Sequence, residues 1–306
     1  FSDFNTFSGQ FSLPKETSAD PTASTNRVFQ IVYAAGVAPA ADPGWGQEMA
    51  LDTQWAHATA PGAKVYLVES ASDDFNDLIA AVKVARSLPN VREVSMSFGG
   101  TEIPCFFAEW DSVFVKSGVA FFAASGDVAA AKDFPAESKN VVCVGGTKLQ
   151  LNIDGSWAGE TAWDSGGCGA SNDEPRPTFQ DGVYPLVGKY RGAVDIAAIA
   201  DVNPGVAVYD TFPDHGQSGW LIIGGTSASC AIMAGIVNSS GVSFASSKDL
   251  NSKLYALMGT SALHDVSAGS TGSFSAAAGW DFPTGAGSPN GLGAALAAAV
   301  GRVARR

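Results

Sequence analysis

The sequence contains few charged residues, and basic residues are the scarcer kind. Only 16% of its 306 residues are charged, against about 25% in an average soluble protein. Its 18 lysines and arginines face 30 aspartates and glutamates, for a net charge of −12. So acidic a chain is a poor partner for nucleic acids and anionic membranes. With few bases it also escapes strong positive self-repulsion in acid, which suits an acidic compartment.

The sequence also lacks long apolar runs, repeats and linkers. No apolar run reaches the ~18 residues of a spanning helix, and no repeat or low-complexity linker divides the chain. A hydrophobic content of 46% is enough for a full-sized core. We therefore predict one soluble domain over residues 1–306. The chain starts at Phe1, which indicates a processed or shortened form without a readable signal peptide.

Cysteine motifs are absent as well. No Cys-x-x-Cys pair occurs, which argues against a zinc ribbon or a thioredoxin-like site. The cysteines could form up to two disulfides or remain buried thiols. Asn238-Ser239-Ser240 is a single glycosylation sequon, a pattern that is common by chance. The four cysteines are Cys105, Cys143, Cys168 and Cys230.

What the sequence does contain is an alternation of apolar strand-like runs with helical patterns. Such a series of βαβ units predicts a mostly parallel sheet covered by helices on both faces. The later part loosens into short strands and glycine-rich loops before a long apolar helix and a final alanine-rich one. We expect strands at 28–35, 63–69, 94–98, 119–124 and 220–223, and helices at 45–60, 73–88, 105–116, 227–237 and 291–303.

Two carboxylates lie four residues apart in the first expected helix. Glu48 and Asp52 therefore share one face, where their side chains can meet. A solvated helix face would explain such a pair equally well. The neighbours argue against it, because Met49, Leu51 and Trp55 help to make this helix apolar nearly all round. Carboxylates in such a helix are costly unless one of them holds a proton.

Two further polar residues stand where a site is expected. Asp127 follows the strand 119–124 in a Ser-Gly-Asp turn, and Ser227 begins the apolar helix after Gly224 and Gly225. In covered parallel sheets, ligands and catalytic groups collect beyond the carboxyl ends of the strands. Either residue could instead be a simple turn former or helix cap. A hydroxyl at a helix N-terminus is nevertheless well placed for nucleophilic attack.

A serine nucleophile needs a base, and histidine is the usual one. His57 lies nine residues after Glu48, about 180° round a helix of 3.6 residues per turn, so we interpret it as structural. His215 and His264 lie in loops without a motif. The residues therefore disfavour a Ser-His-Asp triad and leave a carboxylate as the alternative base.

Four motifs in order resemble those of the sedolisins, or serine-carboxyl peptidases, which look like subtilisins whose triad histidine is replaced by glutamate. The resemblance covers nearly the whole chain and implies a subtilisin-like α/β fold with a mostly parallel central sheet flanked by helices. The matching segments are Glu48-Met-Ala-Leu-Asp52, Ser125-Gly126-Asp127, Phe134-Pro135-Ala136 with Val144-Gly145-Gly146-Thr147, and Gly224-Gly225-Thr226-Ser227-Ala228.

The resemblance implies an acid-active serine-carboxyl endopeptidase that works through an acyl-enzyme. Ser227 would attack the scissile carbonyl, while Glu48 takes its proton and later returns it to the leaving amine. Asp52 would share a proton with Glu48. Protonated Asp127 would donate a hydrogen bond to the oxyanion, together with the Ser227 N–H. The residues that would bind substrate are Ser97 and Gly99.

The family also binds one calcium ion near the C-terminal end, within about residues 262–290 here. Carboxylates and backbone carbonyls are oxygen ligands suited to this hard cation. Without the resemblance, the two acids of this segment would be ordinary loop aspartates. The residues that match the family's calcium site are Asp265, Val266, Ala277, Gly279 and Asp281.

The sequence departs from the family at three places. The catalytic domain of relatives starts with a strand upstream of Phe1 that carries an acid supporting the site, so we expect this strand to have been cleaved off or to remain as a separate chain. Phe98 stands where many relatives have Trp, and Cys168 interrupts a glycine-rich loop. We expect these departures to change the network of hydrogen bonds that surrounds the catalytic residues.

The resemblance further implies protein or peptide substrates, a removed pro-segment, a monomer, and a secreted or lysosome-like acidic location. A tripeptidyl-peptidase of the same family is an alternative activity. Two other classes stay open. One is a subtilisin-type peptidase using His57, although the His-Gly-Thr motif is missing. The other is a catalytically dead relative that acts as a binding module, which the missing strand favours.

Overall fold

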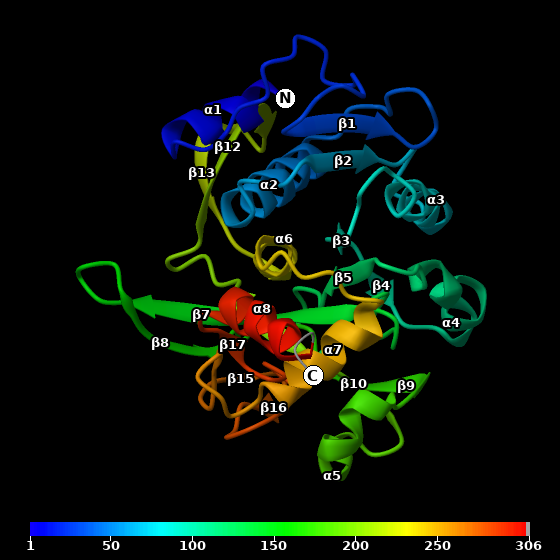
Figure 1. Cartoon of the computed structure of the whole chain (residues 1–306), viewed down its shortest axis with the longest axis vertical. Helices are drawn as coiled ribbons and strands as arrows, with labels where there is room; N and C mark the ends of the chain where they lie inside the picture. The colour runs from blue at the N-terminus through cyan, green and yellow to red at the C-terminus, as the bar shows by residue number, and fades with distance from the viewer. Residues whose placement is uncertain (304–306) are drawn as a thin grey trace.

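The computed structural model describes the backbone of residues 1–303 and the side chains of residues 1–298. Strands and helices alternate along its first half, as expected (Figure 1). This half contains α1 (Ser2–Gln10), β1 (Phe29–Tyr33), α2 (Pro43–Thr59), β2 (Val65–Glu69), α3 (Phe75–Ala85), β3 (Glu93–Met96), β4 (Gly100–Thr101), α4 (Pro104–Trp110), η1 (Asp111–Phe114), β5 (Ala120–Ala124), β6 (Asp133–Phe134) and β7 (Val142–Leu151).

The second half holds shorter strands, one long hairpin and the two helices that the apolar patterns predicted. Its elements are β8 (Trp157–Ala162), β9 (Gly169–Pro175), η2 (Thr178–Val183), α5 (Tyr184–Val187), β10 (Tyr190–Ala193), β11 (Ile196–Ile199), β12 (Val206–Asp214), β13 (Gln217–Ile223), α6 (Thr226–Ser239), α7 (Ser247–Ala256), β14 (Leu263–His264), β15 (Ser270–Thr271), β16 (Phe274–Ser275), β17 (Ser288–Pro289) and α8 (Leu292–Val303). No helix in the described part is long and apolar enough to cross a bilayer.

The central sheet is mostly parallel, which confirms the expected fold class. Its strands lie in the order β11-β7-β5-β3, all parallel, and β8 adds one antiparallel strand to β7. A second parallel pair, β1 and β2, is separate from this sheet. The sheet is therefore in two pieces, which the alternation of strands and helices did not indicate.

Helices cover the sheet on both faces because its inner strands are apolar on both sides. In β5, Phe122 packs in a core cluster with residues of α6, while its neighbour Phe121 packs on the opposite face with residues of α3. Successive strand residues point to opposite faces, so a continuous apolar run fills two cores at once. The helix α6 is buried along most of its length between these layers (Figure 1).

Several predicted boundaries were wrong by a few residues. The helix expected at 105–116 ends at Trp110 and continues as a 3-10 turn, and the strand expected at 94–98 ends at Met96.

The four cysteines are free thiols; Cys105 is exposed and the other three are buried.

Candidate active site

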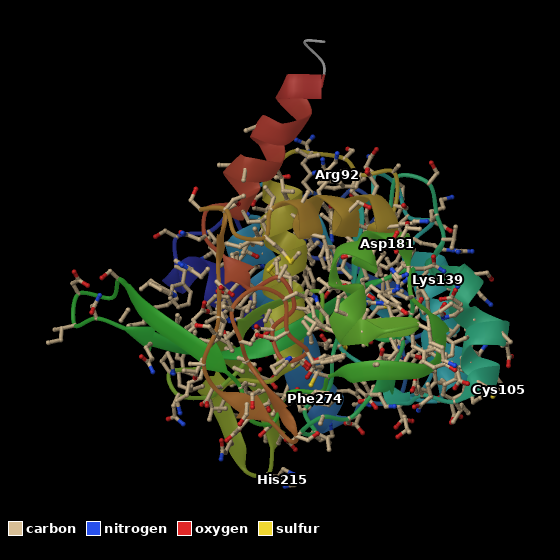
Figure 2. The ribbon with its side chains drawn as sticks, turned by 90° about the horizontal axis from the view of Figure 1, so that it is seen from below. Arg92, Cys105, Lys139, Asp181, His215 and Phe274 are labelled. Carbon is tan, nitrogen blue, oxygen red and sulfur yellow. The ribbon has the colours of Figure 1, made fainter. Side chains whose placement is uncertain are left out.

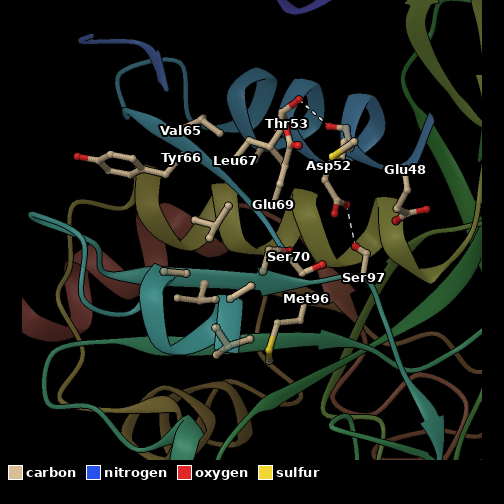
Figure 3. Close-up of a pocket in the computed structure, with 18 of the residues that line it drawn as sticks. Glu48, Asp52, Thr53, Val65, Tyr66, Leu67, Glu69, Ser70, Met96 and Ser97 are labelled. Atoms are coloured by element: carbon tan, nitrogen blue, oxygen red, sulfur yellow. Dashed lines mark hydrogen bonds between the residues drawn. The ribbon is translucent and has the colours of Figure 1, made fainter. Parts of the chain in front are cut away.

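The helix α2 carries both carboxylates of the predicted pair. Asp42 caps it by accepting a hydrogen bond from the Trp45 N–H at 3.0 Å, and Pro43 occupies its first turn, where no N–H is needed. Glu48 and Asp52 lie one turn apart and line a cavity of about 1220 Å³ (Figure 3). The spacing of four residues thus places both carboxyl groups on the same side of the cavity.

Burial raises the pKa of both carboxyls. Protein encloses Asp52 and most of Glu48, although both keep an edge on the cavity. The charge of Glu48 raises the pKa of Asp52 further, and the charge of Asp127 acts likewise on Glu48. The Ser97 hydroxyl opposes this effect by donating to Asp52 Oδ1 at 2.7 Å (Figure 3). Two neighbouring acids with raised pKa values can share a proton in mild acid.

The first residue of α6, Thr226, is hydrogen-bonded to the side chain of Asp127. Oδ1 of Asp127 accepts hydrogen bonds from the N–H and the hydroxyl of Thr226, both at 2.8 Å. Gly225, just before the helix, has a φ of +101°, and a Cβ at this position would lie 2.6 Å from Asp127 Oδ2. Only glycine combines this backbone conformation with so close an approach. The structure therefore brings the Ser-Gly-Asp turn and the Gly-Thr-Ser segment together.

Ser227 is the second residue of α6, and its hydroxyl lies beside Glu48. This nearby hydroxyl lowers the pKa of Glu48 against the larger effect of burial. Glu48 Oε1 is buried and has no hydrogen-bond partner among the described residues, so it is free to accept a proton. The partial positive charge of a helix N-terminus favours negative charge developing on the serine. This arrangement can move a proton from a serine hydroxyl to a carboxylate.

The two residues predicted to bind substrate lie in the segment after β3. Ser97 donates to Asp52 and thus orients a carboxylate. Gly99 is exposed, and a Cβ there would lie 3.2 Å from that of Asp133 in β6. Burial and the charge of Asp127 raise the pKa of Asp133. Sequence reasoning missed Asp133, although it directly precedes one of the motif segments.

The histidines lie away from this site. His57 is fully buried, its Nε2 donates to the Pro14 carbonyl at 2.9 Å, and burial lowers its pKa. His215 lies at an exposed turn at the edge of the molecule (Figure 2), and His264 stacks on an indole ring. The structure thus agrees with a structural role for His57, and among the described side chains no histidine is hydrogen-bonded to Ser227.

The predicted calcium ligands lie together in loops near the C-terminal end. Asp265 accepts hydrogen bonds from the Gly279 N–H at 3.1 Å, and Asp281 accepts one from the Ala277 N–H at 2.8 Å. Burial, and then the charge of Asp265, raise the pKa of Asp281. Two converging carboxylates fit a hard cation, which would offset their repulsion. The described residues hold no cluster of three or more acidic, histidine or cysteine ligands, so backbone oxygens, such as that of Val266, would complete the site.

Known proteins share both the sequence pattern and this fold. A family model described as "Subtilase family" matches residues 34–286. The chain belongs to the subtilase family. This subtilase is 31% identical over 319 residues to kumamolisin of Bacillus sp. (strain MN-32), covering 92% of the chain and 54% of kumamolisin. It is 33% identical over 176 residues to sedolisin of Pseudomonas sp. (strain 101), covering 51% of the chain and 28% of sedolisin.

Solved structures agree with these relatives. Pseudomonas sedolisin, a serine-carboxyl proteinase complexed with two molecules of pseudo-iodotyrostatin, matches with a TM-score of 0.77 and 25% identity, covering 98% of this chain and 88% of the other. Sphericase matches with a TM-score of 0.52 and 18% identity, covering 76% and 69% of the two chains, and shares the fold alone. The chain is therefore a subtilase of the sedolisin type, as its motifs indicated. It spans about half the length of kumamolisin.

Proposed function

We propose that this sedolisin-type subtilase is an acid-active endopeptidase with Ser227 as nucleophile and Glu48 as general base. The observation that carries the proposal is the buried Glu48 carboxyl beside the Ser227 hydroxyl. A general base works best near its own pKa. Burial raises the pKa of Glu48 above the ordinary value of 4.5, so we expect activity in mild acid.

In the proposed mechanism, Ser227 Oγ attacks the carbonyl carbon of the scissile bond while its proton passes to Glu48. Glu48 then returns this proton to the leaving amine, which leaves an acyl-enzyme. A water molecule then attacks the ester carbonyl carbon while its proton passes to Glu48, and Glu48 returns this proton to Ser227 Oγ as the C–Oγ bond breaks and the acid product leaves. Asp52 holds Glu48 in place by sharing a proton with it, and Ser97 fixes Asp52 through their hydrogen bond.

We propose Asp127 as a donor to the oxyanion. Both hydrogen bonds from Thr226 go to Oδ1 of this carboxyl, so Oδ2 is the atom that we propose contacts the oxyanion beside Ser227. The Ser227 N–H is the second proposed donor. Asp127→Ala should lower kcat by about 10²–10³-fold, and Asn, which keeps a donor, should restore part of the loss. Near-wild-type turnover of the Ala variant would remove Asp127 from the mechanism.

We propose one calcium ion in the C-terminal loops, held by the carboxylates of Asp265 and Asp281 and by backbone carbonyls of Val266, Ala277 and Gly279. The ion would supply positive charge that fixes these loops, and no catalytic step uses it.

We further propose a monomer that has lost a pro-segment and works in a secreted or lysosome-like acidic location. The family membership and the acidic composition support this setting.

Turnover of an internally quenched peptide at about pH 4 tests the nucleophile and base. We expect Ser227→Ala and Glu48→Gln each to lower kcat by at least about 10⁴-fold. Asp52→Asn should lower it less, because Asp52 acts on the base and not on substrate. Circular dichroism would confirm that each variant is folded. A folded Glu48→Gln variant with normal turnover would disprove the carboxylate base.

A peptide library with free and blocked N-termini separates the two modes of cleavage. We expect an endopeptidase to cut both sets at internal bonds. Release of tripeptides from the free N-termini alone would identify a tripeptidyl-peptidase instead. Both results would leave the proposed chemistry at Ser227 unchanged.

A further inference from the structure

Glu137 is a buried acid that the proposed peptidase chemistry does not use. It lies three residues beyond β6, and its exposed fraction is 1%. Its Oε2 is buried and has no hydrogen-bond partner among the described residues. An ionised carboxylate in such a place is destabilising, because nothing replaces the water it has lost. The fold therefore accommodates this side chain better with a proton than without one.

The charges around Glu137 are paired with one another. Arg191 of β10 donates from Nη2 to Asp195 Oδ2 at 2.5 Å, and Lys132 Nζ lies 3.4 Å from Glu102 Oε1. These two cations and two acids balance, so Glu137 is the acid of the cluster that lacks a cation of its own. Two thiols complete the titratable groups that its charge reaches, Cys143 of β7 and Cys168 just before β9.

The protonated form of Glu137 belongs to the folded state in acid. Burial raises the pKa of this carboxyl well above its ordinary value, and the charge of Arg191 opposes only part of the effect. A group with a raised folded pKa contributes its full stability below the unfolded pKa. That contribution is lost as the pH rises through the folded pKa. Toward neutral pH, Glu137 therefore favours any conformation that brings it to water.

The segment 133–138, which carries Glu137, also borders the candidate active site. The Glu137 N–H donates to the Asp133 carbonyl at 3.0 Å, which ties the buried acid to β6. The Asp133 side chain approaches the Ser-Gly-Asp turn, where a Cβ on Gly126 would lie 2.6 Å from Asp133 Oδ2. The next residue of this turn is Asp127, the proposed oxyanion donor. Movement of the segment would therefore disturb the site on its oxyanion side.

We infer that Glu137 is a switch that confines the active conformation to acid. In acid the neutral carboxyl is buried on the side of the central sheet away from α6, where β9 and β10 lie (Figure 1). When the carboxyl ionises, the segment 133–138 opens to hydrate the charge, and Asp133 leaves the Ser-Gly-Asp turn. The effect on turnover rests on the proposed function, whereas the opening itself does not.

The buried cysteines report this opening one by one. Cys143 and Cys168 lie in the core cluster that the segment 133–138 helps to form. Cys230 lies in the other cluster, across the sheet, and is the internal control. N-ethylmaleimide reaches a buried thiol only when the structure around it opens. Peptide mapping by mass spectrometry gives the labelling rate at each cysteine. We expect the ratio of the Cys168 rate to the Cys230 rate to rise at least tenfold between about pH 5 and about pH 7.5.

Variants of Glu137 show whether this residue causes the opening. Glu137→Gln keeps the shape of the side chain without its charge, so the rate ratio should stay constant with pH. Glu137→Ala also cannot ionise, should behave alike, and covers a failure of the Gln variant to fold. Glu109→Gln, on an exposed position of α4, is the matched control and should follow wild type. Circular dichroism at about pH 5 checks the fold of each variant.

Turnover measured on the same samples connects the opening to the active site. Each chain is treated with N-ethylmaleimide at about pH 7.5 for increasing times and then assayed at about pH 4. The return to acid reverses the titration of Glu48, whereas a label in the core keeps the segment 133–138 from closing. We expect wild type and Glu109→Gln to lose turnover at least tenfold faster than Glu137→Gln.

Three results would overturn the inference. One is a ratio of labelling rates that does not change with pH, and another is a ratio that rises equally in wild type and in Glu137→Gln. The third is labelling of Cys143, Cys168 and Cys230 at one common rate, which would indicate global unfolding. A wild-type chain that shows the expected ratio but no turnover at any pH would confirm the opening and contradict the proposed peptidase function instead.

Discussion

Asp52 is easier to protonate in the folded chain than in the unfolded one. It is enclosed by protein and faces the charge of Glu48, so its pKa lies well above the ordinary value of 3.8. The folded state therefore binds this proton more tightly. Its contribution to stability is complete below the unfolded pKa and is lost as the pH rises through the raised folded pKa. Above that range the ionised carboxylate destabilises the fold.

Asp52→Asn should remove this pH dependence. Asparagine can still accept the hydrogen bond from Ser97 but cannot ionise. We expect the variant and wild type to melt at similar temperatures at about pH 3.5, and the variant to melt higher at about pH 7. Asp74→Asn just before α3, where the side chain is exposed and makes no capping bond, is the control and should show little change. A Tm difference that stays constant with pH would contradict the argument.

At the scale of elements, α6 and β5 show what a sequence pattern can predict. The apolar run in β5 and the glycines before α6 are local signals, and both elements form as expected. The division of the parallel strands into two sheets, with β1 and β2 apart from the central one, is different, because strand pairing joins segments far apart in the chain and has no local signal. The hairpin of β12 and β13 was missed except for its last residues, because its polar tip obscures the alternation.

The close approach of Gly225 to Asp127 gives a prediction for the start of α6. Gly225→Ala should strain a backbone with a φ of +101° and push against Asp127 Oδ2. We expect a loss of stability of about 1–2 kcal/mol and a loss in kcat/KM of about 10²-fold, because the proposed catalytic groups would shift.

Gly241, just beyond the other end of α6, is the matched control. It also has a positive φ of +72°, but a Cβ there would meet nothing within 4 Å. Gly241→Ala should therefore cost a similar stability and leave kcat/KM unchanged. Chemical denaturation and steady-state kinetics on both variants measure the two effects. If both variants lost activity equally, the contact with Asp127 would not be the cause.

At the scale of the whole molecule, the site depends on residues from distant segments. Sequence motifs singled out Glu48 and Ser227, and the fold brings them together although they lie 179 positions apart along the chain. The buried ion pair of Arg191 with Asp195 could not be predicted, because nothing in the sequence marks these two charges as having 0% exposure. Patterns indicate which residues are unusual, and only the packing shows which of them meet.

Metal removal tests the proposed calcium loops at this scale. A strong chelator at neutral pH should lower Tm, because the ion binds only the folded state. Added Ca²⁺ should restore Tm, whereas Mg²⁺, which prefers a stricter octahedral geometry, should restore less. Asp265→Asn should lower Tm and respond less to the chelator. An unchanged melting curve, with no calcium found by elemental analysis, would remove the proposed site.

The four unpaired cysteines make the chain a reporter of its own unfolding. Cys105 is exposed at the start of α4 (Figure 2), whereas burial raises the pKa of Cys168 and of Cys230 to about 12 and that of Cys143 well above its ordinary range. Alkylating agents react with exposed thiolates. Iodoacetamide should therefore add one group to a native molecule and four to an unfolded one. The relative intensities of the singly and fourfold modified peaks in a mass spectrum would then give the fraction of unfolded molecules for every variant described above.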